Sequence, residues 1–443
     1  MQNTQMGKYS NYKEILKLSF PIILANASAP LLGLADTAAI GNTAGAAELG
    51  AIALASLIFS FVYWGFSFLR MATTGFVAQA VGANDKKLIH EVVYRSLAIG
   101  FAIGLLLILG QQLIGETAIR FMSAGDEVKG LIRSYFYTRI WGAPATLTTY
   151  ALLGALVGMG LTKRLLYVQL LLNGLNIALN ILFVVVFNWS VKGIALGTAL
   201  AEWAAFIYAL WLIFKSLEIN WGEFIARRKE IFNKIEIVKS FKVNADIMIR
   251  TLALLSGFAW FADQGAKFGD DILAANHLLL QFVSLSAFFL DGYAHVVEMT
   301  AGQAFGKRNK TLFLQQVKDA TMLAGLTAVV LAFLLFIGVK WTVPLLTQVK
   351  GVQEIAINFM PFASIYILLS FVAFLMDGAF IGLTRSKEMR NGTIIALIAF
   401  ILSGTFLTVQ YGNTGLWIAF ILYVVVRGLA LGLYFPRLIK SFE

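Results

Sequence analysis

The stretch Gly154-Ala-Leu-Val-Gly158 recurs in the second half of the chain as Gly378-Ala-Phe-Ile-Gly382. A second pair keeps the same offset in numbering, because Gln79-Ala-Val-Gly82 matches Gln303-Ala-Phe-Gly306. This offset is close to half of the 443 residues. Either match alone is a weak signal, but two at one offset indicate an internal duplication. We therefore predict two halves with the same fold.

The chain is far more apolar than a water-soluble protein. Hydrophobic residues make up 59% and charged residues 13% of the sequence, whereas soluble domains carry about 25% charged residues. The apolar runs are continuous rather than alternating, which excludes a membrane β-barrel and favours membrane-spanning helices. The absence of cysteine excludes disulfides and thiolate chemistry, and only three histidines are present.

Twelve apolar segments approach or exceed the roughly 20 residues that a bilayer requires. We predict an all-α polytopic membrane protein with twelve transmembrane helices in two pseudo-symmetric six-helix bundles. The predicted spans are 14–40, 49–80, 88–115, 132–159, 165–187, 192–214, 242–262, 272–304, 316–339, 354–383, 392–410 and 415–436. The expected organisation is an N-terminal lobe, 1–214, a basic cytoplasmic linker, 215–241, and a C-terminal lobe, 242–443.

The 35 Lys and Arg residues concentrate in every second loop and in the linker. Basic loops stay in the cytoplasm, so both termini are expected there. The net charge of +11 is then a signal of topology, and no nucleic-acid partner is predicted. Since six is even, both halves enter the membrane from the same side, which is an architecture of alternating-access transporters.

Asp36 is an acid within the first predicted span, one to two turns beyond Pro30. A charge at mid-bilayer costs roughly 2.5–3.5 kcal/mol on insertion scales, so Asp36 is a functional candidate. Pro30 cannot donate to the carbonyl of Asn26 and clashes with it, which predicts a hinge. Protonation of Asp36 could therefore be coupled to bending of the helix; the alternative is a structural Asp that caps a broken helix.

Three asparagines, Asn173, Asn176 and Asn180, follow one another at i, i+3 and i+7 in the predicted span 165–187. This spacing places all three amides on one helix face. A row of amides suits a hydrogen-bonding wall or a water-lined cavity. For any single asparagine, a hydrogen bond between helices is an equally good interpretation.

Thr198 and Glu202 are one turn apart in the next predicted span and share a face. Glu202 is either a second titrating group or the partner of a nearby base such as Arg139. The residues alone do not choose between these two roles.

The second half has its own charges at membrane depth but no equivalent of Asp36, because the offset maps Asp36 onto Trp260. These charges are Arg250, Asp291, Glu298 and Asp377. An unpaired charge in the membrane is costly, which favours a structural ion-pair network. The alternative is a second cation site at Asp377 and Asp291. The two histidines of this region, His277 and His295, are expected to be core residues, and no metal site is predicted.

At these positions the sequence resembles the multidrug and toxic compound extrusion (MATE) family, in particular its DinF-like branch. The matching segments are Gly33-Leu-Ala-Asp36-Thr, Asn173-Gly-Leu-Asn176-Ile-Ala-Leu-Asn180, Leu290-Asp291-Gly-Tyr-Ala-His-Val-Val-Glu298, Gln303-Ala-Phe-Gly306, and Met376-Asp377-Gly-Ala-Phe-Ile-Gly382 leading into Met389-Arg390-Asn391. They occur in both halves, and the six-plus-six layout covers essentially the whole chain.

The resemblance implies two six-helix lobes that export drug-like cations against inward H⁺ or Na⁺. It places the protonation centre on Asp36, with polar neighbours at Asn176, Asn180 and Thr198. Some related sequences carry a carboxylate where this chain has Asn180. The amide weakens a two-carboxylate Na⁺ site in the N-terminal lobe and favours H⁺.

We therefore expect a proton-coupled multidrug antiporter that works by alternating access, with protonation of Asp36 and bending of helix 1 as the coupling step. Its expected partners are organic cations or amphiphilic drugs and the lipid bilayer. The protein is expected to be a monomer in the bacterial cytoplasmic (inner) membrane, with no cofactor beyond the coupling ion.

Two other transport functions are alternatives. One is a Na⁺-coupled drug antiporter that uses Asp377 and Asp291. The other is a flippase for a lipid-linked precursor, which needs basic residues converging at mid-depth; the candidates are Arg70, Arg139 and Arg250. An enzyme is not expected, because no HExxH, Gly-x-Ser-x-Gly or phosphate-binding loop occurs.

Overall fold

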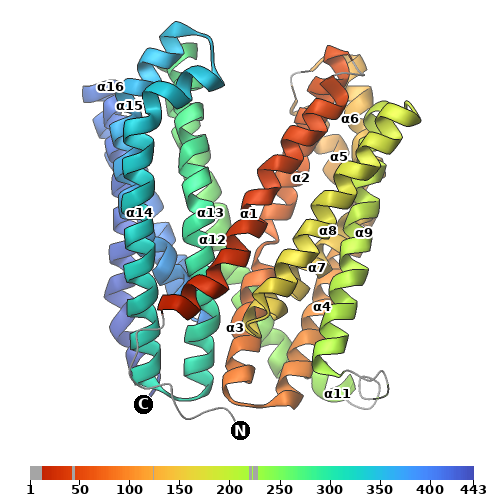
Figure 1. Ribbon diagram of the computed structural model, residues 1–443, viewed down its shortest axis with the longest axis vertical. Coiled ribbons are helices and arrows are strands. Elements are labelled where there is room, and N and C mark those ends of the chain that lie inside the picture. Colours follow the sequence, from red (N-terminus) through yellow and green to blue (C-terminus); the bar gives the residue numbers. More distant parts are fainter. Residues whose placement is uncertain (1–11, 42–44, 123, 219–221, 223–227) are drawn as a thin grey trace. The chain divides into compact units, whose positions relative to one another are not determined.

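The computed structural model describes residues 12–41, 45–122, 124–218, 222 and 228–443, with the backbone alone given for residues 29–41 and 46. Throughout these ranges the regular elements are helices (Figure 1). Ten helical stretches of the described chain are long and apolar enough to cross a membrane. The last of them, Ser386–Lys440, is two helices that meet at Gly412, and α1 (Tyr12–Gly41) is a further 30-residue helix. The described part thus accounts for the twelve predicted spans.

The helices fall into two compact units. The first bundle comprises residues 24–241 and the second bundle comprises residues 12–23 with 242–443 among the described residues. Residues 12–23 of α1 thus pack with the second half of the chain, and the described part of the linker, residues 228–241, packs with the first.

The first bundle contains the greater part of α1 and the helices up to the linker. These are α2 (Ala46–Gly65), α3 (Phe68–Gly82), α4 (Lys86–Leu109), α5 (Gln111–Arg120), α6 (Asp126–Arg139), η1 (Ile140–Gly142), α7 (Ala143–Gly158), α8 (Thr162–Ile181), η2 (Leu182–Val186), α9 (Ser190–Leu217) and α11 (Arg228–Ile231).

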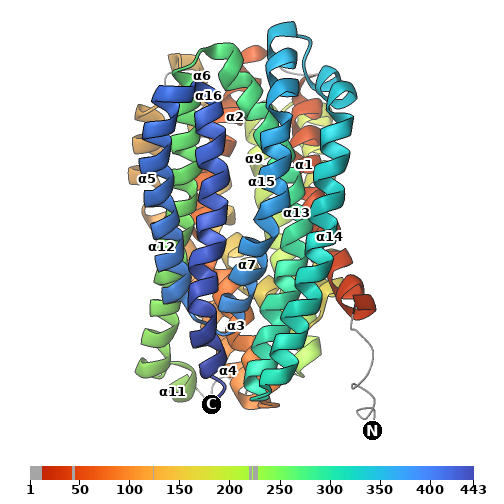
Figure 2. The same ribbon diagram turned by 90° about the vertical axis from the view of Figure 1, so that its left-hand side faces the viewer.

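The second bundle contains five long helices. These are α12 (Lys234–Ala266), α13 (Asp270–Gly306), α14 (Lys310–Leu346), α15 (Lys350–Gly382) and α16 (Ser386–Lys440). Figure 2 shows the two limbs of α16 in blue. At the junction Gly412 has φ 57° and ψ −135°, a conformation that glycine tolerates and other residues rarely adopt.

The duplication predicted from the sequence is present in the positions of the helices. Six helix ends in the first half recur in the second half at the offset of the two sequence motifs. The matched pairs are 46 and 270, 82 and 306, 86 and 310, 126 and 350, 158 and 382, and 162 and 386. The turns repeat as well, since Asn84 and Arg308 are both left-handed, with φ 56° and 53°. Asp85 and Asn309 then cap the next helix in the same way, each accepting a backbone N–H at 2.9 Å.

The repeated glycines explain why this sequence motif is shared. In the first bundle a Cβ at Gly154 would lie 2.3 Å from the carbonyl oxygen of Arg70 on α3. In the second bundle a Cβ at Gly378 would lie 2.5 Å from the carbonyl oxygen of Ala294 on α13. Both distances are too short for a real side chain, so each pair of helices crosses with backbone against backbone. Small residues at these crossings set the helix spacing in both bundles.

The first bundle departs from the predicted spans by breaking several of them. The predicted span 49–80 is divided into α2 and α3 around residues 66–67, where hydrogen bonds such as Phe66 N–H to the Tyr63 carbonyl are local turns. The predicted span 132–159 is divided by the 3₁₀ segment η1. The predicted span 88–115 ends at Leu109, and α5 follows as a separate short helix.

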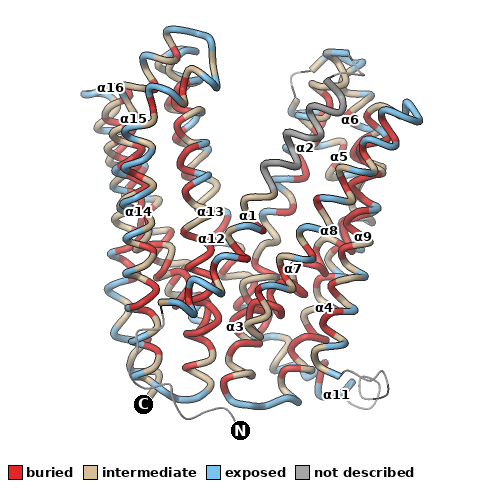
Figure 3. Tube along the Cα trace, in the orientation of Figure 1, coloured by how far each residue is buried: buried red, intermediate tan, exposed pale blue. Residues whose placement is uncertain are grey.

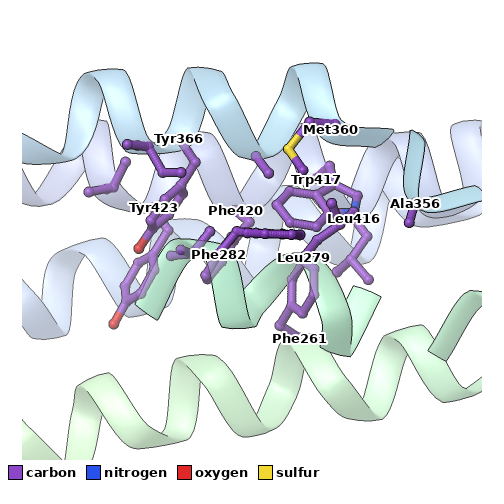
Figure 4. Packing of buried hydrophobic residues seen from close by; sticks show 14 of the residues in the cluster. Phe261, Leu279, Phe282, Ala356, Met360, Tyr366, Leu416, Trp417, Phe420 and Tyr423 are labelled. Carbon is purple, nitrogen blue, oxygen red and sulfur yellow. The ribbon is translucent and has the colours of Figure 1, made fainter. Parts of the chain in front are cut away.

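The core of the second bundle is aromatic (Figure 4). The Phe420 ring lies 4.6 Å from the ring of Phe261 and 4.4 Å from that of Tyr366, measured between centroids. Trp417 is fully buried among them. Burial of rings of this size contributes more apolar contact than any other side chain type.

Apolar side chains also cover the outside of the helices. Figure 3 shows pale blue, exposed segments along α14, and Leu326 and Phe333 of this helix are exposed. Exposed large apolar residues on a helix of this hydropathy are the expected surface toward lipid.

Candidate functional site

Two of the sequence-predicted site residues, Pro30 and Asp36, lie within α1 but outside the residues whose side chains are described. The other candidates are described in full. Those of the first half gather around α8 and α9, and those of the second half lie on α12, α13 and α15.

The three asparagines of α8 form what we call the amide cluster: Asn173, Asn176 and Asn180, with Thr198 of α9. Asn176 Nδ2 donates to Thr198 Oγ1 at 2.8 Å. Asn180 Nδ2 donates to Asn176 Oδ1 at 2.8 Å. All four side chains are more than nine-tenths buried. A continuous row of buried amides fixes the orientation of each member, because the lone pairs and N–H groups must match along the row.

The amide cluster is positioned by two neighbouring helices. On α9, a Cβ at Gly197 would lie 2.3 Å from Asn180 Oδ1, so only glycine lets the amide approach the backbone this closely. On α1, Ser28 Oγ accepts a hydrogen bond of 2.6 Å from Asn173 Nδ2. Three helices of the first bundle therefore meet at the cluster.

Glu202 of α9 lies one turn beyond Thr198 and faces Arg139 at the end of α6. Arg139 Nη2 is 3.5 Å from Glu202 Oε1, and both side chains are largely buried. The guanidinium also donates to the Tyr135 hydroxyl at 2.9 Å. Its carbon lies 4.6 Å from the ring centroid of Phe59 and 5.9 Å from that of Tyr63. We call Arg139 with Tyr135, Phe59 and Tyr63 the arginine cage. Cation–π contacts of this kind stabilise a desolvated cation by about 2 kcal/mol or more.

Asp377 of α15 is held by two guanidinium groups in the second bundle. Arg250 of α12 makes a hydrogen-bonded ion pair with its Oδ2, and Arg427 of α16 lies 3.8 Å from the same oxygen. All three side chains are buried. Two cations beside one carboxylate compensate its charge, so the group is an ion-pair network of the kind expected for structural charges in a membrane.

The remaining candidates of the second half lie on α13. Asp291 is within electrostatic reach of Arg427, and Glu298 is buried. His277 contacts Gln281 one turn away at 3.1 Å. Within the described residues no group of three or more His, Asp or Glu side chains is arranged to hold a metal ion.

Two polar groups of the second bundle were missed by the sequence reasoning. Asn276 and Asn413 exchange hydrogen bonds of 2.7 and 3.1 Å beside the Gly412 junction, and the Trp417 indole N–H donates to Asn276 Oδ1 at 2.9 Å. Near the start of α16, Arg390 donates to Asp246 at 2.6 Å. Single polar residues in apolar runs were the available signal, but each partner lies on a helix distant in the sequence.

Comparison with known proteins agrees with this fold. The MatE family model matches residues 21–182 and 265–409. DNA damage-inducible protein F of Escherichia coli is 32% identical over 97% of this chain and 93% of its own length. Multidrug resistance protein NorM of Vibrio cholerae is 25% identical over 94% of this chain and 93% of its own length. A MOP superfamily transporter from Pyrococcus furiosus superposes with a TM-score of 0.88 at 19% identity, covering 100% and 99% of the two chains.

The family model thus spans most of both bundles, and the Escherichia coli relative aligns along nearly the whole chain. The chain belongs to the MatE family, in its DinF-like branch, and is a multi-pass membrane transporter rather than an enzyme.

Proposed function

We propose that this transporter is a secondary active antiporter that exports organic cations or amphiphilic drugs in exchange for inward H⁺. Asp36 is the proton-binding group, and the amide cluster is the polar wall beside it. The observation that carries the proposal is the buried row Asn180–Asn176–Thr198. The name of the Vibrio cholerae relative, a multidrug resistance protein, supports the class of cargo.

The repeat supports the assignment of Asp36 to the same site as the amides. In the second half the position matching Asp36 is Trp260, whose ring lies 4.8 Å from that of Phe400. Phe400 matches Asn176 at the same offset. Where the second half has an indole and a phenyl ring, the first half has the carboxyl group of Asp36 and the amide of Asn176 at the matching sequence positions, and a carboxyl group can bind and release a proton.

In the proposed cycle, ionised Asp36 favours a cationic cargo in the outward-facing state. Protonation from outside removes that charge, bends helix 1 at Pro30 and releases the cargo. Return to the inward-facing state lets Asp36 lose its proton to the cytoplasm. Exchange of one H⁺ for one monovalent cation moves no net charge, so each unit of pH gradient supplies about 1.4 kcal/mol.

The alternatives are weakened by where the charges lie. A Na⁺ ion at Asp377 would compete with two guanidinium groups that already contact this carboxylate. A pyrophosphate group would require free basic side chains, yet Arg139 contacts Glu202 and Arg250 contacts Asp377. Both arrangements favour a cationic cargo and a proton.

The localisation is proposed together with the function. The bacterial relatives support the bacterial inner membrane, and the concentration of Lys and Arg in alternate loops and in the linker supports cytoplasmic termini.

Everted membrane vesicles energised to an acid interior test the proposal. The parent should take up ethidium, an organic cation, without added Na⁺. Asp36→Asn should reduce uptake to that of vesicles lacking the protein, because an amide cannot carry the proton. Glu116→Gln, which removes an exposed carboxylate, is the matched control and should behave like the parent. Uptake that requires Na⁺, or that survives Asp36→Asn, would contradict the proposal.

A further inference from the structure

We propose that Glu202 is a second proton-binding group of the first bundle, so that two protons enter for each monovalent cation exported. The inference rests on the proposed function, because it adds a proton to the exchange assigned to Asp36. It concerns a different helix and a different set of side chains, and it makes a separate prediction about the movement of charge.

The carboxyl group of Glu202 is only half satisfied. Its single ion-pair contact is the 3.5 Å approach of Arg139 to Oε1. Among the described residues Oε2 is buried and forms no hydrogen bond of ordinary geometry, and the Thr146 hydroxyl is a neighbouring polar group. A buried carboxylate oxygen without a donor is the atom at which an added proton removes the largest desolvation cost.

Arg139 does not depend on Glu202 alone. Removing one partner of a buried ion pair ordinarily strands the other charge. Here the guanidinium keeps the rings of Phe59 and Tyr63 and its hydrogen bond to Tyr135 when Glu202 is neutral. The arginine cage thus makes the neutral state of Glu202 accessible in place.

The break in the fourth predicted span provides the space for Oε2. A Cβ at Gly142, in η1, would lie 1.9 Å from this oxygen. The carboxyl group of Glu202 therefore lies against the backbone at the break between α6 and α7, in the space that a Cβ at position 142 would take. Displacement of Glu202 by a side chain at position 142 would separate it from Arg139.

The titratable groups that interact with Glu202 and Arg139 come from α2, α6 and α7. Arg139 and Tyr135 lie on α6, Tyr63 on α2 and Tyr150 on α7. The phenols are uncharged near neutral pH. Arg139 is therefore the charged side chain that responds when Glu202 gains or loses a proton.

Glu202 is also linked to the proposed transport site through α9. It lies one turn beyond Thr198 on the same face of the helix, and Thr198 accepts the hydrogen bond of Asn176. A change of contact between Glu202 and the arginine cage is transmitted along a single rigid turn to the amide cluster.

Charge counting gives the test. Exchange of two H⁺ for one monovalent cation moves one net positive charge inward, so the membrane potential adds to the pH gradient. In proteoliposomes of the full chain with a fixed pH gradient, the parent's ethidium accumulation should change about tenfold for each ~59 mV of imposed potential. Protein-free liposomes provide the passive background that is subtracted.

The variants separate the two proton sites. Glu202→Gln should keep transport driven by the pH gradient but lose the response to potential. Asp36→Asn should abolish both, and Glu116→Gln should match the parent. A parent that is driven by the pH gradient but indifferent to potential overturns the inference and leaves the proposed function standing, as does a response that persists in Glu202→Gln. A parent without any pH-driven transport overturns the proposed function itself.

A second measurement needs no variant. Purified parent protein that binds ethidium in weakly buffered detergent at a pH where both acids are protonated should release two protons per cation bound, followed with a pH-indicator dye. Release of a single proton contradicts the inference even if Glu202→Gln fails to fold.

Discussion

The two bundles have helix ends at matching sequence positions but differ in the side chains that fill their interiors. Their helix ends repeat at one constant offset, yet the first bundle breaks its helices near residues 66–67 and at 140–142, while α13 and α15 run unbroken through the matching positions. The difference extends to the interior. Asn176 and Asn180 are matched by Phe400 and Gly404, and the Trp260 ring occupies the space beside that glycine, 2.4 Å from where its Cβ would be.

A duplicated arrangement of helices can be kept while its two halves take different roles. The second bundle is packed by rings at the place where the first holds hydrogen-bonded amides. Rings stabilise through buried area, whereas a buried polar row requires complete pairing and is retained for specificity or function. We therefore expect substitutions at matched positions to affect different properties.

The largest effect is expected from Phe400→Ala compared with Asn176→Ala. Phe400 is fully buried, 5.1 Å from the ring of Tyr423 and 4.8 Å from that of Trp260, so its loss should lower the free energy of unfolding by about 3–5 kcal/mol. Asn176→Ala should cost about 1–3 kcal/mol but should stop ethidium uptake. Equilibrium unfolding in mixed micelles measures stability, and vesicle uptake measures transport. If the two variants lost the same amount of transport and were equally stable, the two positions would not have different roles.

Arg250→Gln should destabilise the second bundle by about 3–5 kcal/mol, because it breaks a buried ion pair and leaves Asp377 with the more distant Arg427. The double variant Arg250→Gln/Asp377→Asn should recover part of this loss, since no charge is then left unpaired. The same unfolding measurement applies. A single variant as stable as the parent would show that the pair is not structural.

Gly154→Ala and Gly378→Ala should destabilise by similar amounts, about 1–3 kcal/mol each, because both add a methyl group against a carbonyl at a helix crossing. These two variants test whether the matching helix crossings of the two bundles are equivalent, rather than how the bundles differ. The shift of the unfolding midpoint should agree between the two variants. A large difference between the two shifts would mean that the two helix crossings contribute unequally to stability.

The smallest effect is expected outside the spans, in α5. Hydrogen bonding to Arg133 holds the pKa of the Glu116 carboxyl below its usual range. A lowered pKa in the folded state stabilises the protein above the carboxyl's ordinary pKa, and that contribution is lost as the pH falls through the folded value. Glu116→Gln should therefore flatten the slope of stability against pH slightly on the acid side, and it should leave the slope near neutral pH unchanged. Because the pair is exposed, added salt should weaken the effect.

Much of this fold could be predicted because apolar length and the repeat are local properties of the sequence. The matched pair Gly154 and Gly378 indicated the duplication, and the structure places both glycines at helix crossings. The break at residues 66–67 could not be predicted, because no proline marks it in the sequence. The chain turns there through local backbone hydrogen bonds. Ion pairs between residues distant in the sequence could not be predicted either, because the hydrophobic pattern does not show which basic side chain contacts Asp377.

In the candidate site, the spacing of Asn173, Asn176 and Asn180 predicted a common face, and the structure arranges all three as hydrogen-bond donors to side chains. The role of Glu202 was left open between a second titrating group and the partner of a base such as Arg139, and the structure places Arg139 3.5 Å from it. The cage of rings around Arg139 was not foreseen, because Phe59 and Tyr63 come from another helix and aromatic residues are common throughout the chain.

The start of α1 has a consequence for the order of synthesis. Residues 12–23 pack with the second bundle. Ile23 lies so close to Gly292 of α13 that a Cβ added at Gly292 would be 2.3 Å from Ile23 Cγ1. A ribosome adds about 5–20 residues per second, so on the order of tens of seconds separate this segment from its partner on α13. During that interval this segment lacks its final neighbour. The lipid bilayer or the insertion machinery must shelter its apolar face until the second half of the chain arrives.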